Sequence, residues 1–332
     1  MKIGLWSDSV NFPSIPLMKL SAYNKARGNS VKLIDDFDEH FDIAYCSKSF
    51  NLPLITKIPT LPRLLRADKI YCGGTGFAIE TVGGKERYVK ESDGVLPDEI
   101  EHSYPDYGLY SELTQGTAFG FLTRGCPNAC GFCAVGGKEG LCSTQIAELS
   151  EFWRGQRKIK LMDANLLACK DRERLIQQLA ESKAEINFVQ GLDARFIDGD
   201  IAELLCKCKI DTVHFAFDLM RNERAVINGL EQFRSAYKGS DRALKVYVLT
   251  NYDTSRAEDW YRVRRVMELG YQPDVRIYQK GTHDRFLTDL ARWANNKRIY
   301  RSCAFTDYIP RKDGRCCGEL YGDVIGSEVK TQ

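Results

Sequence analysis

The sequence predicts an α/β protein in which six βα units form a partial barrel behind a small α/β domain. Two observations predict this class. From residue 118 onward, apolar strand-like runs alternate with helical patterns, which is typical of parallel sheets. Before residue 95, short apolar runs flank one helical stretch in the same order. Hydrophobic residues make up 43% of the chain and charged residues 28%, which is the composition of a folded globular protein.

The first 95 residues are expected to form a small Rossmann-like domain. Apolar runs predict strands at residues 2–6, 30–34, 41–46 and 69–72. A helix is expected over residues 15–27, and Gly28 directly after it is a typical helix-ending residue. The glycine-rich turn at residues 73–76 follows the fourth strand and allows two interpretations. It can let a ligand approach the backbone, or it can be a tight turn, which is the simpler reading.

Residues 96–117 have weaker periodicity and are expected to form a linker packed by tyrosines such as Tyr104 and Tyr107. Residues 118–300 are expected to form the barrel, and residues 301–332 a C-terminal tail. Predicted barrel strands cover residues 118–122, 159–162, 186–189, 212–217, 243–249 and 275–278. Predicted helices cover residues 144–155, 171–182, 200–208, 223–237, 255–269 and 284–295. Six such units predict a parallel sheet curled into part of a TIM-like (β/α)6 barrel, with its chemistry at the carboxyl ends of the strands.

Charge and hydropathy narrow the expected partners. Lys and Arg number 47 against 45 Asp and Glu, and a net charge of +2 gives no strong nucleic-acid signal. No apolar run of about 18 residues predicts a membrane span. The first residues also lack the basic start and apolar stretch of a signal peptide. We therefore expect a cytoplasmic protein with no membrane partner.

Cysteines are the most informative residues. The chain has 12, and in a reducing compartment they favour metal binding or thiol chemistry over disulfides. Cys126, Cys130 and Cys133 form a C-x3-C-x2-C pattern directly after the first predicted barrel strand. Soft thiolates select zinc, copper(I) or iron–sulfur clusters. Three ligands can hold a 4Fe–4S cluster with one iron left open, whereas a structural zinc site needs a fourth ligand, for which Cys142 is the candidate.

This cysteine pattern, with Phe132 before the last cysteine, resembles the signature of the radical S-adenosylmethionine superfamily. The resemblance implies a partial (β/α)6 barrel and a 4Fe–4S cluster on Cys126, Cys130 and Cys133. S-adenosylmethionine would bind the open iron and be cleaved reductively to a 5′-deoxyadenosyl radical, which abstracts hydrogen from an unidentified substrate. The electron would come from an external donor such as flavodoxin or ferredoxin.

The resemblance also implies which residues contact S-adenosylmethionine. Asp163 and Asn165 follow the second strand, where the superfamily contacts the methionine amino group, although this chain lacks the usual glycines. Arg195 follows the third strand and suits a carboxylate. The other expected contacts lie in the cysteine loop and at the ends of strands three to five, and they are Phe132, Gln190, Asp218, Leu249 and Asn251. Helix capping by Asp163 and Asn165, and a surface position for Arg195, are the alternatives.

The first domain resembles the cobalamin-binding-type domains that precede some radical barrels. Cobalamin with a histidine lower ligand uses a D-x-H-x-x-G sequence after the first strand, but Asp8 is followed by Ser9 and Val10. Cobalamin is therefore not expected, and a cobalamin-dependent radical methyltransferase is an alternative function. A non-catalytic zinc or iron–sulfur protein is a second alternative. The tail cysteines Cys303, Cys316 and Cys317 match no second cluster pattern and are interpreted as thiols without metal.

Overall fold

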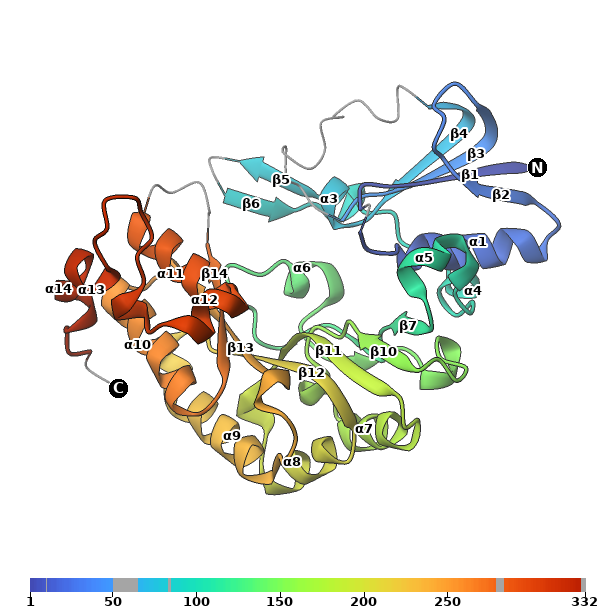
Figure 1. Cartoon of the computed structure of the whole chain (residues 1–332). Coiled ribbons are helices and arrows are strands. Elements are labelled where there is room, and N and C mark those ends of the chain that lie inside the picture. The colour runs from blue at the N-terminus through green and yellow to red at the C-terminus, as the bar shows by residue number, and fades with distance from the viewer. Residues whose placement is uncertain (10, 50–64, 83–84, 279–283, 330–332) are drawn as a thin grey trace. The chain divides into compact units, whose positions relative to one another are not determined.

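The computed structural model describes residues 1–9, 11–49, 65–82, 85–278 and 284–329 (Figure 1). The chain divides into two compact units. The first comprises Met1–Leu141 with Ile146–Lys160, and the second comprises Cys142–Gln145 with Leu161–Gln332. Both units contain parallel strands and helices, so the predicted α/β class is confirmed. The closure of a barrel and the domain boundaries at residues 95, 117 and 300 stay predictions.

A parallel four-stranded sheet lies in the first unit. Its strands are β1 (Lys2–Ser7), β2 (Ser30–Leu33), β3 (His40–Ser47) and β4 (Arg66–Gly73), in the spatial order β2-β1-β3-β4. Helix α1 (Ile15–Ala26) lies along one face of this sheet in Figure 1. One core cluster joins Ile3 and Leu5 of β1 to Leu17 and Leu20 of α1. Burial of these side chains explains why the apolar runs form these elements.

The predicted end of α1 is confirmed. The helix is followed by Gly28, whose φ is +76°, and the Gly28 N–H donates to the Lys25 carbonyl at 3.0 Å. Only glycine takes this left-handed conformation without steric cost. The turn after β4 uses glycine for a similar reason. Gly74 has a φ of +102°, and a Cβ there would stand 2.5 Å from the Lys48 carbonyl oxygen. The close neighbour of this turn is therefore backbone of the same unit, which supports the tight-turn interpretation.

Short elements complete the first unit. Tyr107 anchors this region as the expected packing tyrosine, because its hydroxyl donates to the Phe152 carbonyl at 2.7 Å and accepts from the Phe119 N–H at 3.1 Å. The elements are α3 (Thr75–Ala78), the antiparallel pair β5 (Ile79–Val82) and β6 (Lys85–Tyr88), α4 (Asp98–Glu101), α5 (Ser111–Thr114), β7 (Thr117–Gly120), β8 (Thr123–Arg124) and α6 (Val135–Glu139). The division between the units falls inside β10 (Lys158–Leu161).

Four consecutive parallel strands lie in the second unit, each followed by a helix. The strands are β11 (Glu185–Leu192), β12 (Lys209–Ala216), β13 (Leu244–Thr250) and β14 (Gln272–Ile277), paired in that order. Helix α7 (Arg172–Glu181) precedes β11, and the helices that follow the four strands are α8 (Gly199–Cys206), α9 (Glu223–Ala236), α10 (Arg256–Glu268) and α11 (Arg285–Asn295). In Figure 1, α8, α9 and α10 lie along one side of these strands. The strand and helix alternation predicted for this part of the chain is confirmed.

Burial alternates along the strands of the second unit. On β13, Val246 and Val248 are fully buried, whereas Lys245, Tyr247 and Leu249 between them are half-buried. Period-two alternation places these sets on opposite faces of the sheet. The helices therefore cover an apolar face, and the other face carries polar and aromatic side chains. The tail adds three short helices, α12 (Lys297–Ser302), α13 (Cys317–Leu320) and α14 (Gly322–Ile325).

The helix predicted over residues 144–155 was wrong. The segment forms the short strand β9 (Thr144–Gln145), an irregular stretch and a single 3₁₀ turn, Leu149–Glu151. The N–H groups of Ile146 and Ala147 both donate to the Leu122 carbonyl, at 2.8 and 3.3 Å. These bonds hold Ile146 and Ala147 against Leu122 in a non-helical conformation, and Glu148 caps the 3₁₀ turn that follows. Within the described residues, no helix has both the length and the apolar character needed to span a bilayer.

Candidate functional site

The cysteine loop lies between β8 and α6 in the first unit. Gly125 and Ala129 both adopt left-handed backbone conformations, with φ of +89° and +45°. The Cys126 N–H donates to the Gly140 carbonyl at 3.1 Å, and the Cys133 N–H donates to the Cys130 carbonyl at 3.0 Å. These turns fold the chain back on itself. Cys126 and Cys130 are half-buried and Cys133 is exposed, so the loop presents its thiols near the protein surface.

Glu139 ties the two ends of the cysteine loop together. Its carboxylate pairs with the Arg124 guanidinium at 2.9 Å and accepts the Gly125 N–H at 3.2 Å. Arg124 also stacks over the Phe121 ring, 3.8 Å from the ring centroid. Helix α6, which carries Glu139, is attached in turn to the glycine turn, because Lys138 Nζ donates to Thr75 Oγ1 at 2.6 Å. Glu139 was not among the predicted residues, since nothing in the spacing of a lone glutamate indicates this role.

The cysteines fit an iron–sulfur cluster in donor type and number, because three soft thiolates are what such a cluster takes from a protein. In the structure, however, the three side chains are not arranged as the ligands of a cluster. Across the described part of the chain, no three or more His, Cys, Asp or Glu side chains are grouped so that they could hold a metal ion. Phe132 is half-buried in the same loop. The ligand roles of Cys126, Cys130 and Cys133 therefore stay predictions, and we derive no reaction step from them.

In the second unit, polar residues predicted to meet the cofactor are joined through Asp193. The Asp193 carboxylate receives two bonds from the Arg195 guanidinium, at 2.8 Å from Nε and 2.7 Å from Nη2. It also accepts from Asn165 Nδ2 at 3.3 Å. A bidentate pair of this kind fixes the plane of the guanidinium. Asp193 was not among the predicted site residues, although its place directly after β11 is the signal that could have identified it.

Asn165 also caps the turn that follows β10. Its Oδ1 accepts the Ala168 N–H at 3.2 Å, and its carbonyl accepts from Ser143 Oγ at 2.8 Å. The capping alternative is thus confirmed for Asn165, whose amide is shared between the cap and Asp193. Asp163 is buried beside it, with 4% of the residue exposed. The two residues lie where the sequence places them, at the end of the strand.

Gln190 lies in a bulge of β11. The pairing with β12 shifts from Phe188↔Val213 to Gly191↔His214, so Val189 and Gln190 fall outside the ladder and Gln190 is exposed. One side chain from β12 and one from β13 donate to the carbonyls of this bulge. His214 Nδ1 donates to the Phe188 carbonyl at 2.9 Å, and the Tyr247 hydroxyl donates to the Val189 carbonyl at 2.9 Å. His214 is therefore a hydrogen-bonded core residue, and bulges of this kind often re-aim side chains beside binding sites.

Asp218 and Leu249 are linked directly, because the Leu249 N–H donates to Asp218 Oδ1 at 3.0 Å. Burial raises the pKa of Asp218 to about 6, with the Asp193 charge adding to the effect and the Arg262 charge opposing it. Arg262 is fully buried and donates to the carbonyls of Phe217, Asp218 and Leu249 at 2.7–2.8 Å. The Arg262 side chain therefore connects the ends of β12 and β13. This residue was not among those predicted from the sequence.

Asn251 shapes the turn after β13. Its φ is +63°, its Nδ2 donates to the Tyr278 carbonyl at 3.0 Å, and its N–H donates to Asp259 Oδ2 at 3.1 Å. Asparagine tolerates this left-handed conformation better than most residues. The observed role is therefore structural, and a contact with adenine stays a prediction. Among the predicted residues, the structure brings together Asn165 with Arg195, through Asp193, and Asp218 with Leu249.

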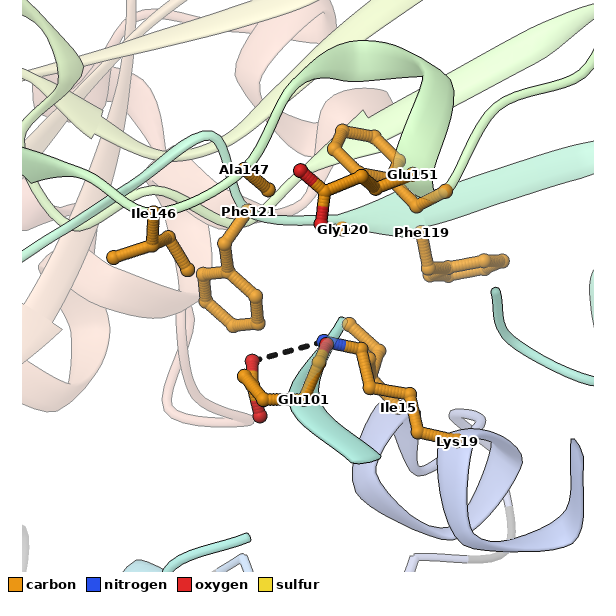
Figure 2. Close-up of a pocket in the computed structure, with 10 residues that line it drawn as sticks. Ile15, Lys19, Glu101, Phe119, Gly120, Phe121, Ile146, Ala147 and Glu151 are labelled. Atoms are coloured by element: carbon orange, nitrogen blue, oxygen red, sulfur yellow. Dashed lines mark hydrogen bonds and ion pairs between the residues drawn. The ribbon is translucent and has the colours of Figure 1, made fainter. Parts of the chain in front are cut away.

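A small pocket in the first unit lies apart from the cysteine loop residues (Figure 2). Its walls include the rings of Phe119, Phe121 and Phe152, and the Lys19–Glu101 ion pair, 2.8 Å long, closes one side. The space inside is about 10 Å³, which is room for a single water molecule. This pocket is too small for a nucleoside cofactor.

Comparison with known proteins adds no identification. No protein-family model matches the chain, and no curated protein matches it. The resemblance to the radical S-adenosylmethionine superfamily therefore depends on the cysteine spacing and on the order of strands and helices around it.

Proposed function

We propose that the protein is a radical S-adenosylmethionine enzyme that holds a 4Fe–4S cluster through Cys126, Cys130 and Cys133. The observation that carries this proposal is three soft donors within eight residues of one loop, which suits a cluster that keeps one iron for another ligand. The surface position of the loop and its clip by Glu139 support it, because both ends of the loop are held while its thiols stay accessible.

The polar strand ends of the second unit are the proposed binding surface for S-adenosylmethionine. Asp193 and Arg195 offer a fixed carboxylate and guanidinium, and Asp218 offers an acceptor suited to a ribose hydroxyl. The bound cluster would supply the electron that cleaves the sulfonium. The residues of this chain would orient the cofactor and exclude water, and the substrate would lose a hydrogen atom.

The test is anaerobic reconstitution with iron and sulfide. We expect about four iron atoms per chain, broad iron–sulfur absorption, and release of 5′-deoxyadenosine and methionine when dithionite and S-adenosylmethionine are added. A reconstituted protein that binds no iron contradicts the proposal. Zinc without iron would favour the metal-binding alternative. Methyl transfer that depends on added cobalamin would favour the methyltransferase.

Two alanine variants sharpen this test. Cys130→Ala should lose the cluster and all 5′-deoxyadenosine formation, since it removes one of three ligands. Cys142→Ala is the control, because Cys142 is an exposed cysteine close to the loop in sequence but outside the C-x3-C-x2-C pattern. It should keep the iron content of the unmodified protein. Equal loss of metal in both variants would indicate a four-thiolate zinc site instead.

A further inference from the structure

Two cysteines face each other across neighbouring strands in the first unit, well outside the cysteine loop. Cys46 of β3 is paired in register with Cys72 of β4, between the pairs Tyr45↔Tyr71 and Ser47↔Gly73. Adjacent strands lie about 4.8 Å apart. That spacing falls within the range of about 4.4–6.8 Å between the Cα atoms of disulfide-bonded cysteines. Both residues are free thiols in the structure.

The surroundings of the two thiols differ. Cys46 is 3% exposed and belongs to the core cluster with Phe41 and Ala44. Cys72 is half-buried on β4, which is the edge strand of the four-stranded sheet. Cys72 also packs partly against this cluster, so it is the more exposed residue of the pair, whereas Cys46 is enclosed by the core.

The Cys46 side chain, as a hydrogen-bond donor to Cys72, lowers the pKa of Cys72 to about 7, and the same interaction together with burial raises the pKa of Cys46. A thiol with a pKa near neutrality combines a substantial thiolate fraction with good nucleophilicity. Cys72 is thus both the more exposed cysteine and the one with the lower pKa, so both properties favour it as the reactive thiol.

We propose that Cys46 and Cys72 form a redox-active dithiol that exchanges with small-molecule disulfides. The Cys72 thiolate attacks one sulfur of the disulfide RSSR, which forms a mixed disulfide and releases one RS⁻ that takes up a proton. Cys46 then loses its proton and attacks Cys72 Sγ, which closes the Cys46–Cys72 disulfide and releases the second RS⁻ as a thiol. Two protein thiols are oxidised and one disulfide is reduced to two RSH, so two electrons are exchanged.

The backbone around the pair suits this exchange. The Lys48 N–H donates to the Gly73 carbonyl at 3.0 Å, so pairing of the two strands continues beyond the cysteines. Ladder contacts on both sides hold the two residues opposite each other in the reduced protein. The disulfide can therefore form between residues that already lie at the required spacing.

Equilibration of the full-length protein with glutathione disulfide and reduced glutathione tests this proposal without any variant. After acid quenching, alkylation in denaturant and proteolysis, mass spectrometry should show the Cys46 and Cys72 peptides linked under oxidising conditions and separately alkylated under reducing conditions. Cys206, which is also half-buried, serves as the internal control and should stay alkylated throughout. Full alkylation of Cys46 and Cys72 at every glutathione ratio would overturn the proposal.

A variant assigns the roles of the two thiols. In Cys46→Ala, which also removes the hydrogen-bond donor, glutathione should accumulate as a mixed disulfide on Cys72. Its alkylation rate at pH 7 should fall about 10-fold as the Cys72 thiol returns toward an ordinary thiol pKa. An unchanged rate in a folded variant, verified by circular dichroism, would overturn the assignment of Cys72 as the attacking thiol.

Discussion

The cysteine loop of the first unit and the strand ends of the second unit carry polar chemistry in contrasting ways. In the loop, the backbone turns through Gly125 and Ala129, and Glu139 fixes only the two ends. At the strand ends, Asp193 and Asp218 are each bonded to neighbouring residues of the same unit. The loop is thus held from its ends while its thiols stay accessible, whereas the strand ends are ordered residue by residue.

This contrast teaches where substitutions should act. A substitution of a buried residue that bonds to the strand ends should lower the stability of the second unit, because the polar groups there depend on one another for hydrogen bonds. A change at the loop clip should alter local opening with little effect on global stability. Substitutions in the two regions test this difference.

Replacing Arg262 with methionine should have the largest effect. Its guanidinium pairs with Asp259 at 2.6 Å, and the side chains of both residues are almost completely buried. Loss of the arginine leaves three carbonyls without this donor and the buried Asp259 carboxylate without its opposite charge, which we expect to cost about 3–5 kcal/mol of the free energy of unfolding. Urea denaturation measures this cost.

Arg264→Met is the matched control for Arg262→Met. Arg264 lies on the same helix, and its ion pair with Glu268 is 3.5 Å long and about half exposed, so its loss should change the free energy by less than about 1 kcal/mol. Equal destabilisation by the two variants would mean that the buried position of Arg262 has no special importance.

Sequence patterns predicted the α/β class and the alternation of strands and helices, because alternating apolar runs and helical periodicity are local signals. They failed at residues 144–155, where the donors of Ile146 and Ala147 bind the distant Leu122 carbonyl. The candidate site followed the same rule. The cysteine spacing and the residues after each strand could be found from sequence. Arg262 and Glu139 could not, because their importance comes from carbonyls and N–H groups that only the folded chain brings near them.

Asp218→Asn should stabilise the protein above neutral pH. Burial raises the pKa of Asp218 from 3.8 to about 6, so the folded state binds this proton more tightly than the unfolded state. The contribution of Asp218 to the free energy of unfolding is therefore fully present below pH 4, and it is lost as the pH rises to about 6. Asparagine can still accept the Leu249 N–H and has no charge to desolvate. We expect a gain of about 2 kcal/mol at pH 7.5 and almost none at pH 4.

Thermal or urea unfolding of both proteins across pH 4–8 measures the Asp218 effect. Glu223→Gln is the control, because this carboxylate also lies in the second unit and also accepts a hydrogen bond, in its case from the Tyr261 hydroxyl. A gain that is independent of pH would show that Asp218 is not held in its protonated form by burial. It would also weaken the view that the strand ends of the second unit are closely ordered.

The smallest expected effect is that of Glu139→Gln on the cysteine loop. The substitution removes the ion pair with Arg124, which is 27% exposed, while an amide oxygen can still accept the Gly125 N–H. We expect a loss of less than about 1 kcal/mol in global stability, because a partly exposed pair contributes little. Amide exchange at Gly125 and Cys126 should nevertheless be about threefold faster, since the loop opens without global unfolding.

Hydrogen exchange followed by mass spectrometry measures the effect of Glu139→Gln, with Glu112→Gln on the exposed side of α5 as the control. Unchanged exchange in the loop would mean that the turns at Gly125 and Ala129 alone maintain its conformation.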